Sequence, residues 1–233
     1  MPRVRVVLVR PETSANVGAC ARVVRNTGAA GLDLVAPGDF RTVECWRTAW
    51  GAHDVLEDAR VFDDLRAALR DVSRAYAFTG RRRSEGPSPV DVRDAAAEVA
   101  ALAPDAAAAL VFGPETNGLT NDELALCGRA AGIPSDPAQP SYNLSHAVAI
   151  AAYEMRRARL RPADEPRALA THDQKEALLE LLEAGLVAVS ALPRANTAAY
   201  FADWRALVQR IDLTPKELTL LEHLARKLRQ AER

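Results

Sequence analysis

The first two thirds of the chain alternate between short apolar runs and stretches in which apolar residues recur every three or four positions. The runs are rich in β-branched residues, as buried strands are; they predict strands at 4–9, 32–35, 60–62, 75–79, 107–112 and 129–133. The spaced stretches predict helices at 17–26, 42–50, 64–69, 91–102, 120–126 and 144–160. We expect Ser14 or Asn16 to cap the first helix and Asp63 the third. This alternation predicts an α/β fold, a mostly parallel sheet with helices on both faces.

The last third of the chain predicts a small bundle of helices. Amphipathic helices are expected at 172–189, 197–210 and 214–230. The last of these opens with Thr214-Pro215-Lys216-Glu217, a capping box with proline at the first helical position. Before the bundle, Arg, Pro, Asp and Glu residues follow no clear period. We therefore expect a domain at 1–160, a linker at 161–170 and a C-terminal helical domain at 171–233.

Four of the predicted strands end in polar loops that carry glycine or proline. These strands end at Val9, Thr79, Phe112 and Ile133. Ligands of parallel sheets bind beyond the carboxyl ends of the strands, so we expect these loops to gather there. The loop after Ile133 holds three prolines within seven residues and runs directly into a helix. Each proline fixes its own φ, and the first N–H groups of the helix are free to meet a polar ligand.

The composition narrows the class of protein. Of the 233 residues, 48% are hydrophobic and 26% are charged, which is ordinary for a globular protein. There is no apolar run of about 18 residues, and the first residues lack the apolar core of a signal peptide, so we expect a cytoplasmic protein without a membrane span. Cys20, Cys45 and Cys127 are scattered and the four histidines are dispersed. Neither a disulfide framework nor a metal site is expected from this pattern.

The net charge of −1 hides an uneven distribution along the chain. Residues 1–83 hold 14 arginines against 10 acidic residues, whereas residues 84–204 hold 9 basic against 17 acidic residues. Residues 205–233 return to 7 basic against 4 acidic residues. A local patch that binds a polyanion is compatible with this distribution, but the net charge of the whole chain does not indicate one.

Several common cofactor motifs are absent. The first predicted strand is followed by Arg10-Pro11-Glu12-Thr13-Ser14-Ala15-Asn16-Val17-Gly18, which lacks the G-x-G-x-x-G fingerprint of dinucleotide-binding folds. The chain also lacks a Walker loop and a G-x-S-x-G nucleophile elbow. These absences disfavour a Rossmann-type oxidoreductase, an ordinary open-sheet methyltransferase, an NTPase and an α/β-hydrolase.

Three segments carry a joint signature instead. The first contains Asn16, Gly18, Arg22 and Gly28; the second is a strand that ends in Gly113-Pro114-Glu115-Thr116-Asn117-Gly118-Leu119; the third is Ile133-Pro134 with Ser141-Tyr142-Asn143-Leu144-Ser145-His146-Ala147. In this order they resemble the motifs of the SpoU, or SPOUT, family of knotted RNA methyltransferases. The segment at Thr79 and the C-terminal helices look most like the TrmJ-like branch of that family.

The resemblance implies a trefoil knot in the later part of the first domain, a homodimer, and S-adenosylmethionine as the cofactor. It implies that the cofactor is held, largely through backbone groups, by Thr79, Gly80, Arg81, Gly113, Ile133, Ser141, Tyr142, Asn143 and Leu144. The polar catalytic set that it implies consists of Asn16, Arg22, Glu115 and Asn143. The basic residues that we expect to contact RNA are Arg10, Arg25, Arg82 and Arg83. Proline-braced loops suit such a cofactor because they present N–H and C=O groups to adenine without flexing.

The resemblance gives Arg22 the role of general base. A guanidinium with a pKa above about 12 is poorly suited to accept a proton, so a clamp on an RNA phosphate, with charge stabilisation at the reacting oxygen, is physically easier. Three positions depart from the family pattern. Tyr142 replaces a leucine beside the adenine, Gly80 removes a possible hydrogen bond to the cofactor, and His146 replaces a small residue at the expected dimer seam.

The activity implied by the resemblance is methyl transfer from S-adenosylmethionine to a ribose 2′-hydroxyl of tRNA, at position thirty-two of the anticodon loop. Two alternatives stay open: the same reaction on rRNA, and a catalytically silent RNA-binding protein on the same scaffold. Plainer interpretations also remain for some residues. Arg81-Arg82-Arg83 is compatible with a solvated charge run, Asn143 with a simple helix cap, and Tyr200, Phe201 and Trp204 with the core of the helical bundle.

Overall fold

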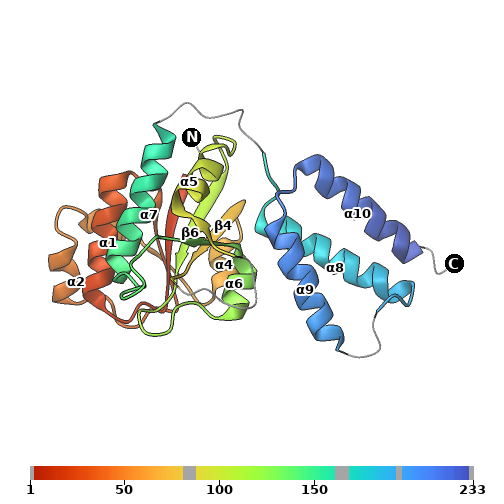
Figure 1. Cartoon of the computed structure of the whole chain (residues 1–233), viewed down its shortest axis with the longest axis horizontal. Coiled ribbons are helices and arrows are strands. Elements are labelled where there is room, and N and C mark those ends of the chain that lie inside the picture. Colours follow the sequence, from red (N-terminus) through yellow and green to blue (C-terminus); the bar gives the residue numbers. More distant parts are fainter. Residues whose placement is uncertain (1–2, 81–87, 161–167, 193–195, 231–233) are drawn as a thin grey trace.

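A seven-stranded sheet forms the centre of the first domain, as the computed structural model in Figure 1 shows. The structure describes residues 3–80, 88–160, 168–192 and 196–230. The strand order is β3-β2-β1-β6-β4-β7-β5, and every pair of neighbours is parallel. The strands are β1 (Arg3–Val9), β2 (Gly31–Val35), β3 (Arg60–Phe62), β4 (Arg74–Phe78), β5 (Val90–Asp91), β6 (Ala107–Phe112) and β7 (Gly128–Gly132).

Helices cover both faces of this sheet and give it two separate apolar cores. One core is formed with α1 (Ser14–Thr27), α2 (Val43–Thr48), α3 (His53–Glu57), α5 (Val92–Ala100) and α7 (Leu144–Arg159). The other is formed with the short helices α4 (Leu65–Leu69) and α6 (Asn121–Cys127). The central strand β6 is buried along its whole length because both cores pack against it.

The order of the strands brings the predicted loops together. The four strands β1, β6, β4 and β7 are consecutive neighbours in the sheet. The loops that leave their carboxyl ends therefore lie along one edge, as the sequence predicted. Glycine ends α1 in the expected way: Gly28 has φ 65° and donates its backbone N–H to the Val24 carbonyl.

The remaining helices α8 (His172–Ala188), α9 (Thr197–Arg210) and α10 (Pro215–Gln230) share a core of their own (Figure 1). The predicted capping box of α10 is confirmed, because Thr214 and Glu217 exchange hydrogen bonds at its start. Thr171 and Gln174 cap the start of α8 in the same way, which the sequence analysis did not predict. The bundle lies against the first domain, because α9 packs on α6 and β7. Of the three aromatic residues expected in its core, only Trp204 packs against the buried cluster.

The parallel α/β sheet with helices on both faces is confirmed, while some local predictions were wrong. Thr13, and neither Ser14 nor Asn16, occupies the cap position of α1, and its side chain makes no capping bond. The cap of α4 is Asp64, whose carboxylate accepts from the Ala67 N–H, so Asp63 was the wrong choice. The trefoil knot and the division into domains stay predictions.

Two elements were missed by the sequence analysis, α3 and β5. Each is short, five and two residues long respectively, so neither shows a full period of apolar positions. Two residues of the predicted linker make contacts with the rest of the chain. Leu169 and Ala170 are buried, and the Ala170 N–H donates to the Leu213 carbonyl at 2.7 Å.

Candidate functional site

A cavity of about 650 Å³ opens at the carboxyl ends of the central strands. It is lined by the loops after β4, β6 and β7 and by the start of α7. This is the place at which ligands bind parallel sheets, and the volume is that of a small-molecule site. The lining residues are Phe78, Thr79, Gly80, Phe112, Gly113, Pro114, Glu115, Thr116, Asn117, Gly118, Leu119, Ile133, Gln139, Pro140, Ser141, Tyr142, Asn143, Leu144 and Ala147.

All of the described residues that were predicted to hold a cofactor line this cavity. They come from three loops that are far apart in the sequence: Thr79 and Gly80; Gly113; and Ile133 with Ser141, Tyr142, Asn143 and Leu144. Arg81, the remaining member of the predicted set, lies outside the described residues.

Two glycines allow the loops around the cavity to approach one another. A Cβ atom on Gly80 would lie 2.7 Å from the Pro140 carbonyl oxygen, and one on Gly113 would lie 2.4 Å from the Leu119 nitrogen. Both distances are below the closest approach of real Cβ atoms to backbone. The sequence analysis considered only that Gly80 removes a possible hydrogen bond to the cofactor. The structure shows that Gly80 is required for the contact between the loop after β4 and the proline-rich loop.

The proline-rich loop is closed by its own side chains. The Tyr142 hydroxyl donates to the Pro134 carbonyl at 3.1 Å, and the Ser135 hydroxyl donates to the Pro140 carbonyl, also at 3.1 Å. Tyr142 nevertheless leaves 43% of its surface exposed, at the cavity. Tyrosine at this position thus has a structural partner that leucine cannot have, because only the hydroxyl reaches the other end of the loop.

Glu115 is the centre of a hydrogen-bond network at the rim of the cavity. Its carboxylate accepts from the Glu12 N–H at 2.9 Å, the Thr13 N–H at 3.2 Å and the Asn16 side-chain amide at 2.8 Å. Burial alone raises the pKa of this carboxyl group, but the bonds from Asn16 and from the backbone outweigh burial and lower it. Glu115 is therefore ionised at neutral pH, and most of its acceptor positions are occupied.

Asn143 extends this network to the first turn of α7. Its side-chain N–H donates to the side-chain oxygen Oδ1 of Asn16 at 3.1 Å, and its own side-chain oxygen Oδ1 accepts from the Ser145 N–H at 2.9 Å. Asn143 is thus the N-cap of α7 and at the same time part of the polar network. The predicted residues Asn16, Glu115 and Asn143, from three of the signature segments, form one connected chain of hydrogen bonds.

Arg22 is not part of this chain. It lies on α1, is exposed, and has no hydrogen bond or ion pair with the residues that the structure describes. Neither Arg22 nor Asn16 lines the cavity. A free, exposed guanidinium on the same helix as Asn16 has its donors available for a phosphate group.

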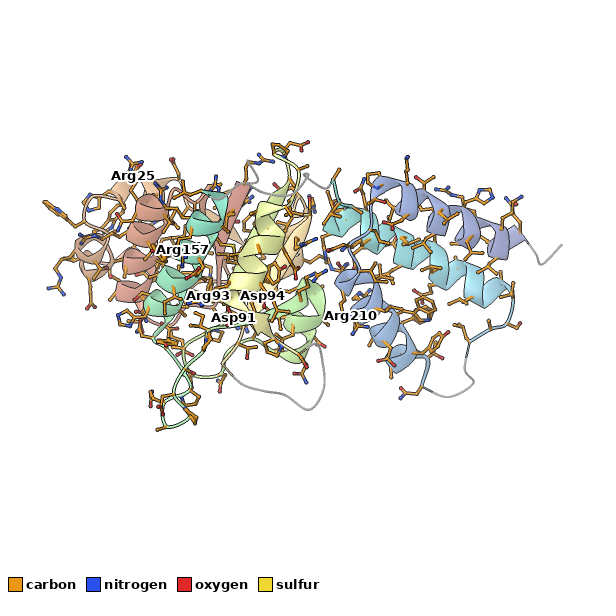
Figure 2. The ribbon with its side chains drawn as sticks, turned by 45° about the horizontal axis from the view of Figure 1, so that its top comes forward. Arg25, Asp91, Arg93, Asp94, Arg157 and Arg210 are labelled. Atoms are coloured by element: carbon orange, nitrogen blue, oxygen red, sulfur yellow. The ribbon has the colours of Figure 1, made fainter. Side chains whose placement is uncertain are left out.

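The predicted RNA-contacting residues fall into two groups. Arg10 is held by both carboxylate oxygens of Glu123, and Arg25 pairs with Asp54 at 2.8 Å. Arg25 lies at the end of the molecule that is opposite the C-terminal helices (Figure 2). Arg82 and Arg83 lie outside the described residues. The described members of the set, Arg10 and Arg25, are thus paired with carboxylates. To bind an RNA phosphate, each arginine would have to break its ion pair or bind the phosphate and the carboxylate together.

Glu12 is a site residue that the sequence analysis missed. Its carboxylate accepts from the Thr116 N–H at 3.2 Å and from the Thr116 hydroxyl at 2.7 Å, while its own N–H donates to Glu115. The loops after β1 and β6 are therefore joined in both directions. The available signal was its position, because Glu12 comes three residues after the end of a buried strand.

Among the described residues, no group of three or more His, Cys, Asp or Glu side chains is arranged to hold a metal ion. No helix of the described chain is long and apolar enough to cross a membrane.

Comparison with known proteins gives consistent results. The family model of the SpoU rRNA Methylase family matches residues 3–153. The tRNA (cytidine/uridine/adenosine-2′-O-)-methyltransferase TrmJ of Pseudomonas aeruginosa (strain UCBPP-PA14) is 33% identical over 235 residues, which cover 95% of this chain and 91% of that protein. The TrmJ of Pectobacterium atrosepticum, a tRNA (cytidine/uridine-2′-O-)-methyltransferase, is 32% identical and covers 95% of this chain and 94% of its own length.

A solved structure extends the likeness to the whole fold. The crystal structure of TrmJ from Z. mobilis ZM4 superposes with a TM-score of 0.81 at 29% sequence identity. The alignment covers 98% of this chain and 99% of that chain, so it includes the C-terminal helices.

Proposed function

Because the chain belongs to the SpoU rRNA Methylase family, we propose that it is a methyltransferase that moves the methyl group of S-adenosylmethionine to a ribose 2′-hydroxyl of tRNA. We place the target at position thirty-two of the anticodon loop. The observation that carries this proposal is the hydrogen-bonded chain of Glu115, Asn16 and Asn143 at the rim of a cavity of about 650 Å³.

The residues of the cavity fit the proposed cofactor. The space is large enough for a nucleoside that carries a short amino-acid chain. Most of its lining residues belong to loops, whose backbone N–H and C=O groups suit an adenine edge. Because Gly80 and Gly113 have no side chains, the loops that form the walls can pack closely against one another. When bound, S-adenosylmethionine supplies an electrophilic methyl group on sulfur. We assign its binding to Thr79, Gly80, Gly113, Ile133 and the segment 141–144.

The reaction needs a positioned hydroxyl and a destination for its proton. Glu115 is poorly suited to take that proton, because its pKa is lowered by the bonds that it already accepts. We propose instead that Glu115 fixes Asn16, and that Asn16 and Asn143 orient the ribose. In this scheme the hydroxyl proton passes to solvent water, while Arg22 holds an RNA phosphate and stabilises charge at the attacking oxygen, since a protonated guanidinium has no free site to accept a proton.

The proposed assembly is a homodimer with tRNA as its partner. The likeness to two tRNA methyltransferases over more than nine tenths of the chain supports tRNA, and the matched C-terminal helices support a shared mode of recognition. Among the described residues, Arg10 and Arg25 are paired with carboxylates, so a second copy would supply further cations for a polyanion.

The test is an assay of the purified protein with radiolabelled S-adenosylmethionine on transcripts of tRNA and of rRNA. We expect label in tRNA only, with the modified nucleotide mapped by its resistance to alkaline hydrolysis. Label in rRNA alone would favour the related rRNA enzyme. Bound cofactor and bound RNA without transfer to either would instead favour an RNA-binding protein on the same scaffold.

A further inference from the structure

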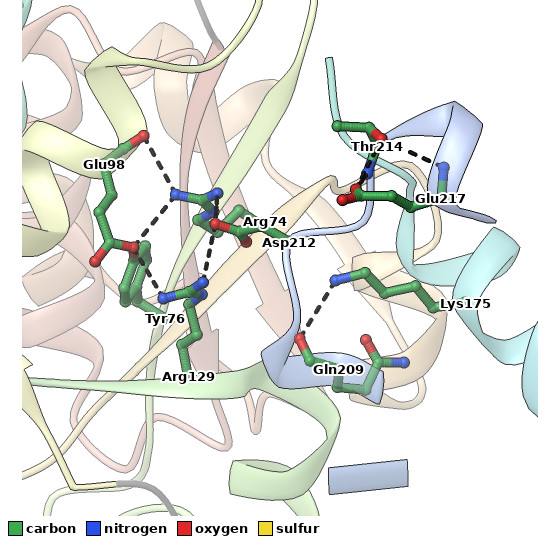
Figure 3. Close-up of polar contacts among 9 residues, drawn as sticks. All are labelled: Arg74, Tyr76, Glu98, Arg129, Lys175, Gln209, Asp212, Thr214 and Glu217. Carbon is green, nitrogen blue, oxygen red and sulfur yellow. Dashed lines mark hydrogen bonds and ion pairs between the residues drawn. The ribbon is translucent and has the colours of Figure 1, made fainter. Parts of the chain in front are cut away.

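A second polar cluster lies at the opposite end of the sheet, where the C-terminal helices meet the first domain. We call it the seam cluster; it consists of Arg74, Glu98, Arg129, His172, Lys175, Gln209 and Asp212. Figure 3 shows all of these residues except His172. Arg74 and Arg129 stand near the beginnings of β4 and β7. The proposed methyl-transfer site lies at the other ends of these same two strands, so the seam cluster has no part in it.

The two arginines of the seam cluster are bridged by two carboxylates. Arg129 donates to Glu98 at 3.0 Å and to Asp212 at 2.9 Å. Arg74 donates to Glu98 at 3.3 Å and also pairs with Asp212. Asp212 follows α9, so a residue of the C-terminal helices joins the two strands of the sheet. The four groups balance in charge, two guanidinium groups against two carboxylates.

A small cavity lies beside these ion pairs. Its volume is about 10 Å³, which is enough for one water molecule or one small ion. Its walls include Arg74, Arg129, His172, Lys175 and Asp212. Besides His172, the walls thus contain three basic side chains, Arg74, Arg129 and Lys175, and one carboxylate, Asp212.

Two buried nitrogen atoms of the residues in these walls have no hydrogen-bond partner in the part of the chain that the structure describes. They are Nε of Arg74, whose side chain is 5% exposed, and Nε2 of His172, a residue that is also 5% exposed. Lys175 is 4% exposed and donates to the Gln209 carbonyl at 3.3 Å, which leaves further protons of its ammonium group to be satisfied. Buried polar atoms without partners are rare and costly, and the residues that carry these atoms line one cavity.

The charge around the cavity points to the sign of its occupant. Lys175 adds a third positive charge to the balanced set of two arginines and two carboxylates. Glu176, close by, already accepts from both Arg66 and Arg205 and does not offset it. Burial, more than the neighbouring arginines, lowers the pKa of Lys175 to about 8, so the ammonium form still predominates at neutral pH.

We propose that this cavity binds one small monovalent anion of the chloride class between Arg74, Lys175 and His172. The anion accepts from the Arg74 Nε–H, from the Lys175 ammonium and from His172 when its Nε2 carries the ring proton. It neutralises the unpaired charge that Lys175 brings into the seam. Because the walls come from both parts of the chain, the anion also holds the C-terminal helices against the sheet.

Thermal unfolding of the full chain tests this proposal in solution. At equal ionic strength, chloride or bromide should raise the midpoint above that in gluconate, an anion too large for the cavity, and the midpoint should rise with the logarithm of the chloride concentration. Lys175→Met keeps the apolar stem and removes the charge, so this variant should lose the dependence on chloride. Lys216→Met, at an exposed position, should keep it. Equal chloride dependence of all three proteins would overturn the proposal.

Crystals soaked in bromide give a direct readout that does not depend on the stability of any variant. We expect an anomalous peak inside the cavity in the unchanged protein. An ordered water molecule there, without anomalous signal, would show that the donors are satisfied by solvent and would also overturn the proposal. Neither experiment measures methyl transfer, so their outcome is separate from that of the proposed function.

Discussion

The two ends of strands β4 and β7 carry polar clusters that are built on different principles. At the carboxyl ends, Glu115 is surrounded by neutral amide donors at the rim of a cavity of about 650 Å³. At the other ends, Glu98 and Asp212 are surrounded by arginines beside a cavity of about 10 Å³. Neutral donors fix a carboxylate in place and leave its negative charge in the site, whereas arginines cancel the charge.

This difference separates a binding site from a structural contact. A site that receives a positively charged cofactor profits from a carboxylate whose charge is not cancelled. A contact between two parts of a chain needs charges that satisfy one another, because a buried unpaired charge is costly. The comparison predicts that changes at the carboxyl ends reduce activity with little effect on stability, and that changes at the seam do the opposite.

Gly128→Ala should have the largest effect. Gly128 has φ 71°, and a Cβ atom there would lie 2.4 Å from the Gln209 carbonyl carbon, so the substitution combines backbone strain with a backbone clash. We expect a loss of roughly 3 kcal/mol in the free energy of unfolding, measured in urea. Gly31→Ala is the matched control, because nothing lies within 4 Å of a Cβ atom at that strand position. Equal losses in both variants would show that the contact between Gly128 and Gln209 does not contribute specially to stability.

Glu115→Gln should break the other side of the comparison. The amide of glutamine presents an N–H group to backbone N–H donors that now meet a carboxylate, and Asn16 loses its anchor. We expect methyl transfer to fall about 100-fold, with a change of less than about 1 kcal/mol in the free energy of unfolding. Glu57→Gln, an exposed residue at the end of α3, should leave both quantities unchanged. A loss of stability without loss of activity would make Glu115 a structural residue.

The pH dependence of stability tests whether Lys175 of the seam cluster is buried and charged. The pKa of Lys175 is lowered to about 8 in the folded protein from 10.5, chiefly by burial and then by Arg74 and Arg129, while Asp212 opposes the shift. Between these values the folded protein has lost the proton that the unfolded chain keeps, so stability rises with pH. Relative to Lys175→Met, the unchanged protein should gain roughly 2 kcal/mol from pH 8 to 10.5 in gluconate.

Taking the difference between these two proteins matters, because other groups titrate in the same range. Burial raises the pKa of Tyr76 and of the Cys20 and Cys127 thiols, which lowers stability at high pH in both proteins equally. Chloride should shrink the measured difference, since a bound anion favours the charged form of Lys175. A flat difference curve in gluconate would contradict the buried, charged lysine.

Tyr142→Phe should have the smallest effect. It removes the hydrogen bond to the Pro134 carbonyl and keeps the ring at the cavity. We expect the affinity for S-adenosylmethionine to fall about 3- to 10-fold, in line with the loss of one partly exposed hydrogen bond, with unfolding unchanged. Isothermal titration calorimetry measures this directly, and Tyr153→Phe, an exposed tyrosine on α7, is the control. Affinity equal to that of the control variant would mean that the prolines alone stiffen the loop.

Much of the fold followed from patterns that act locally. Strands β3 and β6 were predicted at their observed bounds. Strand β6 stands out in the sequence because a buried strand in a parallel sheet is apolar on both faces. Helix α9 was predicted at its observed bounds as well. The two-residue strand β5 escaped, since its pairing with β7 depends on the sheet already being in place.

The candidate site divides in the same way. The resemblance to the motifs of the SpoU family identified Asn16, Glu115 and Asn143 as members of one polar set. It did not show that Arg10 is held by Glu123, more than one hundred positions away, because the identity of an ionic partner depends on how the loops pack. Glu12 was missed for the same reason.

The sequence by itself determined the alternation of strands and helices, the capping box of α10, and the residues that gather at the carboxyl ends of the strands, because each depends on near neighbours in the chain. Only the tertiary structure decided that Gly80 and Gly128 are points of backbone contact and that Asp212 bridges Arg74 and Arg129. It also decided that Lys175, one of three lysines in the chain, is buried beside a cavity. These are contacts between distant segments, and their energies arise from burial and proximity, which no local pattern encodes.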